Sequence, residues 1–208
     1  MPGSPFNDRV ESEAELRQLM GHPSELVRHK VINHLDVHCR HFIELSPYLL
    51  MSTADVNGEC DASPRGDAPG FVKVIDERRL VIPERPGNRR MDSLRNILDN
   101  RLIFLIPGLE ETLRINGSAY STRDNDLLSD MDINGRIPLV GIGVEVNECY
   151  IHCAKSIKRS RLWQTDSWTN PDRLPNPAKI LADHARLPGL TADKVAESLL
   201  ESYTKRLY

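Results

Sequence analysis

The apolar residues of this chain recur at two spacings, and the change between them separates helical ends from a strand-rich middle. Near the N-terminus, an apolar residue at every third or fourth position predicts a short helix over residues 12–20 and a longer one over 24–45. The same spacing predicts helices over 178–184 and 191–206, the second capped by Thr191. Both ends of the chain are therefore expected to be helical.

In the middle of the chain, short apolar runs alternate with polar residues and turn signals. Alternation is cleanest over residues 112–120, where every second side chain is apolar, and Asn57-Gly58 is a strong two-residue hairpin signal. The other expected strands cover residues 48–53, 59–65, 71–75, 80–82, 102–106, 139–146 and 149–154, with a helix over 89–99. This order predicts a mainly β, α+β fold, an antiparallel barrel with helices at both termini and between strands. The chain lacks βαβ spacing and a GxGxxG motif, which argues against a Rossmann domain.

The composition is that of one globular domain with a buried core. The chain has 208 residues, 39% hydrophobic and 27% charged, with a formal net charge of −3. No apolar run reaches the roughly 18 residues of a membrane span, and the charge gives no reason to expect nucleic acid. The chain lacks a signal-peptide pattern, and its four cysteines form no Cys-x-x-Cys pair, so we expect a cytoplasmic protein with reduced, mostly buried thiols.

Three histidines at helical spacing are the strongest candidates for a metal site. They are His34, His38 and His41. His38 falls within the apolar stripe of the expected helix and the other two lie beside it, with no carboxylate at a complementary offset. We therefore expect no metal.

Two arginine-bearing stretches carry the chemistry that the sequence suggests. Residues 62–71 place Arg65 in a bend rich in glycine and proline, and residues 84–95 place Arg89 and Arg90 just before the expected helix. Guanidinium groups, hydroxyls and free main-chain N–H groups that converge at a helix start are suited to a phosphate dianion. The sequence therefore predicts a phosphorylated ligand.

Four stretches in order resemble the flavin-nucleotide-binding proteins related to pyridoxamine 5′-phosphate oxidase. They are residues 63–71, 82–96, 104–117 and 151–163. With the strand at 48–53 they extend over roughly residues 45–165. The resemblance implies the FMN-binding split-barrel fold of that family, in which a homodimer holds two FMN molecules in clefts between its subunits.

The resemblance also implies which residues bind the cofactor. Arg65, Arg89 and Arg90 match the phosphate contacts, with Ser93 as a hydroxyl donor. The main chain of Gly66 and Asp67 would line the isoalloxazine. Late in the chain, we expect Lys155 or Arg159 near the phosphate or ring carbonyls and Trp163 near the flavin, including from across the dimer.

Each of these residues also has a purely structural interpretation. Arg89 and Arg90 fit a solvated helix start, although cations are disfavoured there without an anion. Arg65 fits a structural turn braced by a neighbouring aspartate. Lys155 and Arg159 fit a solvent-facing strand end, and Trp163 fits dimer packing.

The domain organisation and function follow from the same resemblance. We expect an N-terminal helical segment over residues 1–45, the barrel over 46–165 and a C-terminal helical extension over 166–208.

The implied function is an FMN-dependent oxidoreductase acting on an unidentified small molecule, with a nicotinamide as a candidate electron donor. A flavin-binding or storage module without turnover is an alternative, as is a deazaflavin or haem in place of FMN. Pyridoxamine 5′-phosphate oxidation is less favoured because the oxidase's C-terminal arginine/histidine motif is missing. The sequence points to no catalytic side chain.

Overall fold

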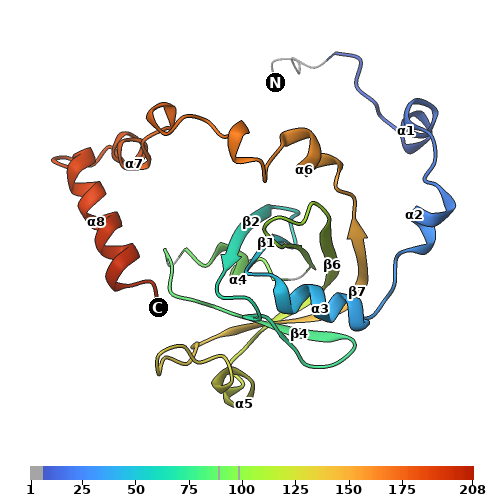
Figure 1. Ribbon diagram of the computed structural model, residues 1–208, viewed down its shortest axis with the longest axis horizontal. Coiled ribbons are helices and arrows are strands. Elements are labelled where there is room, and N and C mark those ends of the chain that lie inside the picture. Colours follow the sequence, from blue (N-terminus) through green and yellow to red (C-terminus); the bar gives the residue numbers. More distant parts are fainter. Residues whose placement is uncertain (1–6, 89, 98) are drawn as a thin grey trace.

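The computed structural model describes residues 7–88, 90–97 and 99–208. At its centre lies one seven-stranded sheet in the order β2-β1-β5-β6-β7-β4-β3, and the ladders between these strands are antiparallel (Figure 1). The strands are β1 (Tyr48–Ala54), β2 (Cys60–Gly66), β3 (Lys73–Val74), β4 (Arg79–Pro83), β5 (Asp99–Leu105), β6 (Thr112–Thr122) and β7 (Gly141–His152).

The helices gather at the two ends of the chain and in the connections between strands. Figure 1 shows α1 and α2 on one side of the sheet, α7 and α8 on the other, and α6 between them at the top of the view. The helices are α1 (Glu13–Met20), α2 (Glu25–His29), α3 (Val37–Leu45), α4 (Asp92–Arg95), α5 (Asn125–Ser129), α6 (Lys155–Ser160), α7 (Pro177–Ala185) and α8 (Ala192–Lys205). The described helices include none with the length and apolarity that a bilayer crossing requires.

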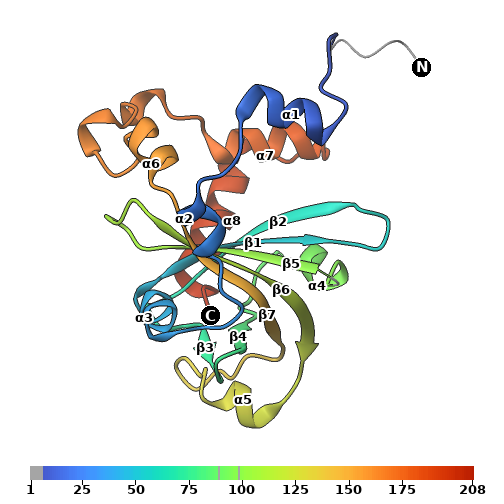
Figure 2. The same ribbon diagram turned by 90° about the vertical axis from the view of Figure 1, so that its right-hand side faces the viewer.

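The predicted fold class, an antiparallel β structure with helices at both ends and between strands, is confirmed. The sheet twists strongly, so that β3 and β4 lie well away from β1 and β2 (Figure 2). It is an open sheet: within the described residues its edge strands, β2 and β3, form no ladder with each other. The sheet therefore curves around its core without closing into a cylinder.

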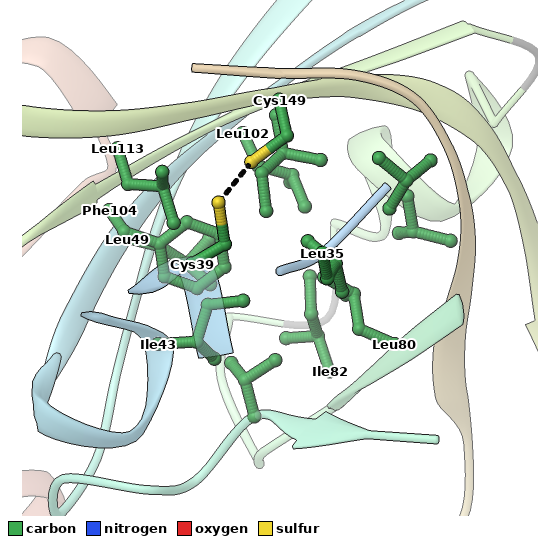
Figure 3. Close-up of a cluster of buried hydrophobic side chains, with 14 of the residues drawn as sticks. Leu35, Cys39, Ile43, Leu49, Leu80, Ile82, Leu102, Phe104, Leu113 and Cys149 are labelled. Carbon is green, nitrogen blue, oxygen red and sulfur yellow. Dashed lines mark hydrogen bonds between the residues drawn. The ribbon is translucent and has the colours of Figure 1, made fainter. Parts of the chain in front are cut away.

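The core fills the concave side of this sheet and is covered by α3. The alternation predicted for 112–120 is present in β6, where Leu113, Ile115 and Ala119 are buried. From α3, the sulfur of Cys39 lies 3.2 Å from that of Cys149 on β7 (Figure 3). This contact and burial raise the pKa of the Cys149 thiol. Cys60 and Cys153 are exposed, so half of the cysteines are buried rather than most of them.

The single helix predicted over 24–45 is wrong, because the chain forms α2 and α3 with an extended segment between them. Ile32 exchanges two main-chain hydrogen bonds with Cys149 of β7, and the N–H of Leu35 donates to the carbonyl of Glu77. These contacts hold the segment against the sheet. The carboxylate of Asp36 then accepts a hydrogen bond from the N–H of Cys39 at 2.8 Å and starts α3.

Replacing Asp36 with alanine should destabilise the fold by about 1 kcal/mol, because it removes this N-cap. The hydrogen bond from the Cys39 N–H lowers the pKa of Asp36 below its usual 3.8. The cap therefore stabilises the fold above that pH, and its contribution is lost as the pH falls through the lowered pKa. Urea unfolding at neutral pH measures the effect. Asp36→Asn is the control and should be near neutral, since asparagine caps equally well.

Several other elements also differ from the predictions. The strands expected at 139–146 and 149–154 are one strand, β7, which pairs with β6 across a register shift at Asn116/Gly117. The helix expected over 89–99 is α4, with only one turn, although residues 89 and 98 lie outside the described part of the chain. The short helices α5 and α6 were not predicted, because neither is long enough to establish a periodic pattern.

Candidate functional site

A cavity of about 890 Å³ opens beside the edge strand β2. Its walls come from β2 and the bend after it, the loop between β4 and α4, the first turn of α4, and residues 207–208 after α8. Segments more than 100 residues apart in sequence therefore meet here. Both arginine-bearing stretches singled out in the sequence lie in these walls.

The local sequence explains why these segments leave the regular sheet. Pro83 and Pro86 interrupt the β4–α4 connection, because proline has no N–H to donate to a ladder. At the start of α4, Met91 adopts a left-handed conformation with φ of 59°. At the end of β2, a side chain at Gly66 would come within 3.3 Å of the carbonyl oxygen of Pro47. Chain direction changes at each of these points, which leaves room for the cavity.

Arg65 is held in the cavity wall by an ion pair with Glu84. Its side chain is 13% exposed, and one guanidinium nitrogen contacts the Glu84 carboxylate. Its Nε is buried and has no hydrogen-bond partner within the described residues. A buried donor without an acceptor is costly, so this N–H is suited to donate a hydrogen bond to a ligand oxygen.

A second arginine, Arg85, joins Asp67 and Tyr208 in a hydrogen-bonded network. The Nε of Arg85 donates to one oxygen of Asp67 at 2.8 Å, and the hydroxyl of Tyr208 donates to the other at 2.9 Å. The carboxylate of Asp67 is 1% exposed. The hydrogen bond to this carboxylate raises the pKa of Tyr208. Arg85 also donates to the carbonyl of Met131 at 2.9 Å, which ties the network to the loop after α5.

The other end of the cavity holds Arg90 and Ser93. Arg90 pairs with Asp92 at 2.7 Å, a hydrogen bond that raises the pKa of Arg90, yet its side chain remains 73% exposed. The buried hydroxyl of Ser93 donates to Asp61 of β2 at 2.6 Å. This end therefore offers a mobile guanidinium and a fixed hydroxyl.

The structure brings together five of the residues that the sequence singled out as cofactor contacts. These are Arg65, Gly66, Asp67, Arg90 and Ser93, which all line the cavity. Gly66 contributes main chain, as expected, whereas the Asp67 side chain is turned into the Arg85 network. Arg89 lies outside the described residues.

The three late candidates lie elsewhere within the same chain. Lys155 and Arg159 are exposed on α6, and the indole N–H of Trp163 donates to the carbonyl of Leu109 at 2.8 Å. None of the three is among the residues that line the cavity. Within one chain, α6 therefore does not supply the cavity.

The lining residues that were not predicted from the sequence include Phe71, Arg85 and Tyr208. Arg85 lies in the same arginine-bearing stretch as Arg90, and that position could have pointed to it. Tyr208 gives no local signal, because its partner Asp67 is 141 residues away. As for metals, no group of three histidine, cysteine or carboxylate side chains comes together in the part of the chain that the structure describes.

The charged side chains that line the cavity are already paired within the chain. Three arginines and four carboxylates line it among the described residues, and each carboxylate accepts a hydrogen bond from within the chain. An anionic ligand must therefore compete with Glu84 and Asp92 for Arg65 and Arg90. Exposed pairs such as Arg90–Asp92 are weak, so this competition costs little at that end.

Several solved structures are similar to part of this chain. HupZ from Group A Streptococcus has 11% sequence identity and a TM-score of 0.45, over 56% of this chain and 92% of that one. An FMN-binding protein from Syntrophomonas wolfei has 10% identity and a TM-score of 0.42, over 55% and 88%. General Stress Protein 26 from Bacillus anthracis has 13% identity and a TM-score of 0.41, over 54% and 88%. At these scores the likeness carries no information about function.

The family comparison is more informative. No curated protein matches the chain. A family model, described as pyridoxamine 5′-phosphate oxidase, matches residues 35–153. This region is more than half of the chain and contains the whole sheet and the cavity walls other than residues 207–208. The chain therefore belongs to the pyridoxamine 5′-phosphate oxidase family.

Proposed function

We propose that this protein binds FMN in the cavity beside β2 and acts as a flavin-dependent oxidoreductase on a small molecule. The observation that carries the proposal is that Arg65, Arg90 and Ser93, chosen from the sequence as phosphate contacts, line one cavity in a chain of this family. The substrate is not specified by these residues.

The cavity fits the cofactor in size, and its arginines supply donors for the phosphate although four carboxylates lie among them. A volume of about 890 Å³ lies within the roughly 300–1,000 Å³ that ligand sites occupy. From Asp61 to Asp67, β2 and its bend extend about 20 Å along the cavity, at about 3.3 Å per residue. This length accommodates a phosphate at the Ser93 end and a ring system at the Asp67 end.

Each cavity residue has a defined task in this proposal. Arg90 turns from Asp92 toward the phosphate, and the Ser93 hydroxyl and the Nε of Arg65 provide further donors. In this proposal the planar ring lies against the main chain of Gly66, which lines the cavity. FMN, when bound, supplies the hydride or electron transfer. The protein binds and orients the cofactor, and three of its four cavity carboxylates pair with the arginines.

The absorbance spectrum of the purified protein tests the proposal most directly. Flavin bands in the protein as purified, or after FMN is added and the excess removed, are expected. Titration with riboflavin, which lacks the phosphate, should show much weaker binding than FMN. A protein that stays colourless under both conditions would contradict the proposal.

Replacing Arg90 with alanine should weaken FMN binding by about 2 kcal/mol, since a hydrogen bond to a charged group contributes about that much. Riboflavin binding should not change, because the lost contact is to the phosphate. Calorimetric titration of both ligands gives the comparison. Arg79→Ala is the matched control, since Arg79 forms an exposed pair with Asp76 outside this cavity. Equal FMN affinity in wild type and Arg90→Ala would place the phosphate elsewhere.

We also propose that the protein is a homodimer. Its accessible surface is 15,011 Å², whereas a compact monomer of 23.6 kDa exposes about 9,800 Å². Part of the exposed surface lies on two helical arms, formed by α1 and α2 and by α7 and α8, where Leu19, Met20, Leu26, Leu200 and Tyr203 are more than 60% exposed. A second copy that packs against both arms accounts for this surface. Light scattering should give twice the chain mass, and a monomer at micromolar concentration would contradict the proposal.

In the proposed dimer, Lys155, Arg159 and Trp163 of one chain would contact the cofactor bound by the other chain. These residues lie on and after α6, away from the cavity of their own chain. In a dimer, α6 of one chain can face the cavity of the other. We therefore keep them as cofactor contacts contributed by the partner copy.

A flavin-binding module without turnover is the second candidate. It is favoured by the engagement of all four cavity carboxylates in hydrogen bonds, which leaves them poorly suited to act as a base. Anaerobic addition of NADH or NADPH, followed by the rate of flavin bleaching, separates the two. Saturable reduction supports the oxidoreductase with a nicotinamide donor, whereas photoreduction without saturable turnover of any acceptor supports the passive module.

A further inference from the structure

The segment after α8 leaves the helical arm and enters the cavity wall. Figure 1 shows α8 running down beside the sheet, so that the C end of the chain meets the loop between β4 and α4. Residues 207 and 208 line the cavity there. Two hydrogen bonds hold the segment: the Tyr208 hydroxyl donates to Asp67, and Arg136 donates to the main-chain oxygen of Tyr208.

The carboxylate of Asp67 holds this segment in place. One of its oxygens accepts from its neighbour Ala68 at 2.8 Å and from Tyr208 at 2.9 Å, and the other accepts from Arg85 at 2.8 Å. The carboxylate is almost completely buried and fully engaged. It is therefore unsuited to act as an acid or a base, but well suited to hold a tyrosine hydroxyl in a fixed position.

The rest of the segment is loosely held, which makes it able to open. Leu207 is 58% exposed, and α8 contains no buried residue. The helix packs on α7, and neither helix is embedded in the core. Local opening that breaks few contacts costs little, so the two hydrogen bonds of Tyr208 determine how often the segment is released.

The position of Tyr208 along the cavity indicates what it covers. Ser93 and Arg90 lie beside Asp61, at the start of β2, whereas Tyr208 lies beside Asp67, just past the end of β2. Ser93 and Arg90 are thus at the opposite end of the cavity from Tyr208, whereas Arg65 lies nearer to Tyr208, two residues before Asp67. If the phosphate binds at Ser93, as the proposed function requires, Tyr208 lies at the ring end.

We propose that residues 206–208 form a latch over the ring end of the cavity, and that Tyr208 is the residue that controls passage of the flavin nucleotide. The proposal rests on the proposed function for the identity of the ligand. The latch must open for FMN to pass, and it closes again on both the empty and the loaded cavity. It therefore slows binding and release together and leaves the affinity nearly unchanged.

Stopped-flow binding and release of FMN by the full-length protein test the latch. A hydrogen bond to a charged group shifts an equilibrium by roughly 10-fold or more, so Tyr208→Phe should raise both rate constants by about that factor. A variant that lacks residues 206–208 loses both bonds, each with one charged partner, and should raise both rate constants by roughly 100-fold. The control is Tyr203→Phe, which removes a hydroxyl from a tyrosine that is 64% exposed on α8, and both rates should equal those of wild type.

Rate constants that stay at the wild-type values in the truncated variant would overturn the latch. So would a rise in the release rate alone, since that would make Tyr208 a ligand contact rather than a gate. Hydrogen exchange of the ligand-free protein gives an independent reading, because Tyr208→Phe should speed exchange at residues 205–208 and at 66–68. If wild type binds no FMN, the proposed function fails, and the exchange measurement still decides whether the latch exists.

Discussion

Replacing Gly117 with alanine should destabilise the fold by about 3 kcal/mol. Gly117 lies at the register shift between β6 and β7. A Cβ at this position would overlap the carbonyl oxygen of Glu145 and lie 3.0 Å from its carbon. These are main-chain atoms in the centre of the sheet, so they cannot move aside as a flexible side chain would. Urea unfolding should show a lower midpoint with an unchanged slope.

Gly143→Ala on the neighbouring strand is the control for this substitution. A Cβ there would lie 3.7 Å from the nearest atom, the carbonyl oxygen of Tyr120, which is an ordinary contact. The added methyl should therefore change stability by less than about 1 kcal/mol. If both variants are equally stable, the close approach of the two strands at Gly117 is not what requires glycine there.

Replacing Arg65 with alanine should weaken FMN binding by about 3 kcal/mol, more than 100-fold, because a charged donor to the phosphate is lost. Arg65 is the least exposed of the three arginines that line the cavity in the described chain. Its loss also leaves Glu84 next to the phosphate site without its partner, which adds repulsion. FMN titration followed by fluorescence measures the change.

A second substitution separates binding from folding in this experiment. In the double variant Arg65→Ala and Glu84→Gln, the unpaired carboxylate is removed, so the unfolding midpoint should recover while FMN affinity stays low. Arg65→Lys should bind with intermediate affinity, since lysine keeps the charge but lacks the planar fork of donors. FMN affinity that returns to the wild-type value in the double variant would show that Arg65 acts only by neutralising Glu84.

The elements that the sequence predicted well are those with a local cause. Ser12 caps α1, Thr191 caps α8, and each accepts a hydrogen bond from the N–H three residues later. The hairpin between β1 and β2 is present and Gly58 has a positive φ, but the connection covers residues 55–59 rather than the two residues predicted. In β6, alternate side chains face the core. Such features depend on residues a few positions apart, so a pattern in the sequence is enough to find them.

The errors come from interactions between distant segments. Residues 30–36 would continue a helix by their spacing, but Ile32 is bound to Cys149, 117 positions later. Tyr208 lies in the cavity only because α7 and α8 carry it back to Asp67. Arg65 and Arg90 were found because both lie beside glycine- and proline-rich bends, whereas Lys155 and Trp163 were placed by resemblance alone. Pairing between distant segments produces no periodic pattern of residues in the sequence. A contact with a second copy of the chain produces none either.

The contact between α3 and β7 has a consequence during synthesis of the chain. The strand that carries Cys149 forms part of the core against which the apolar side of α3 packs, and the two cysteines are 110 residues apart. At roughly 5–20 residues per second, the ribosome needs about 6–20 s to make that interval. Throughout it, Leu35, Phe42 and Ile43 of a nascent chain lack part of the core that buries them in the folded protein. Chaperones that bind short apolar segments should therefore associate with this protein early in translation and be released once β7 emerges.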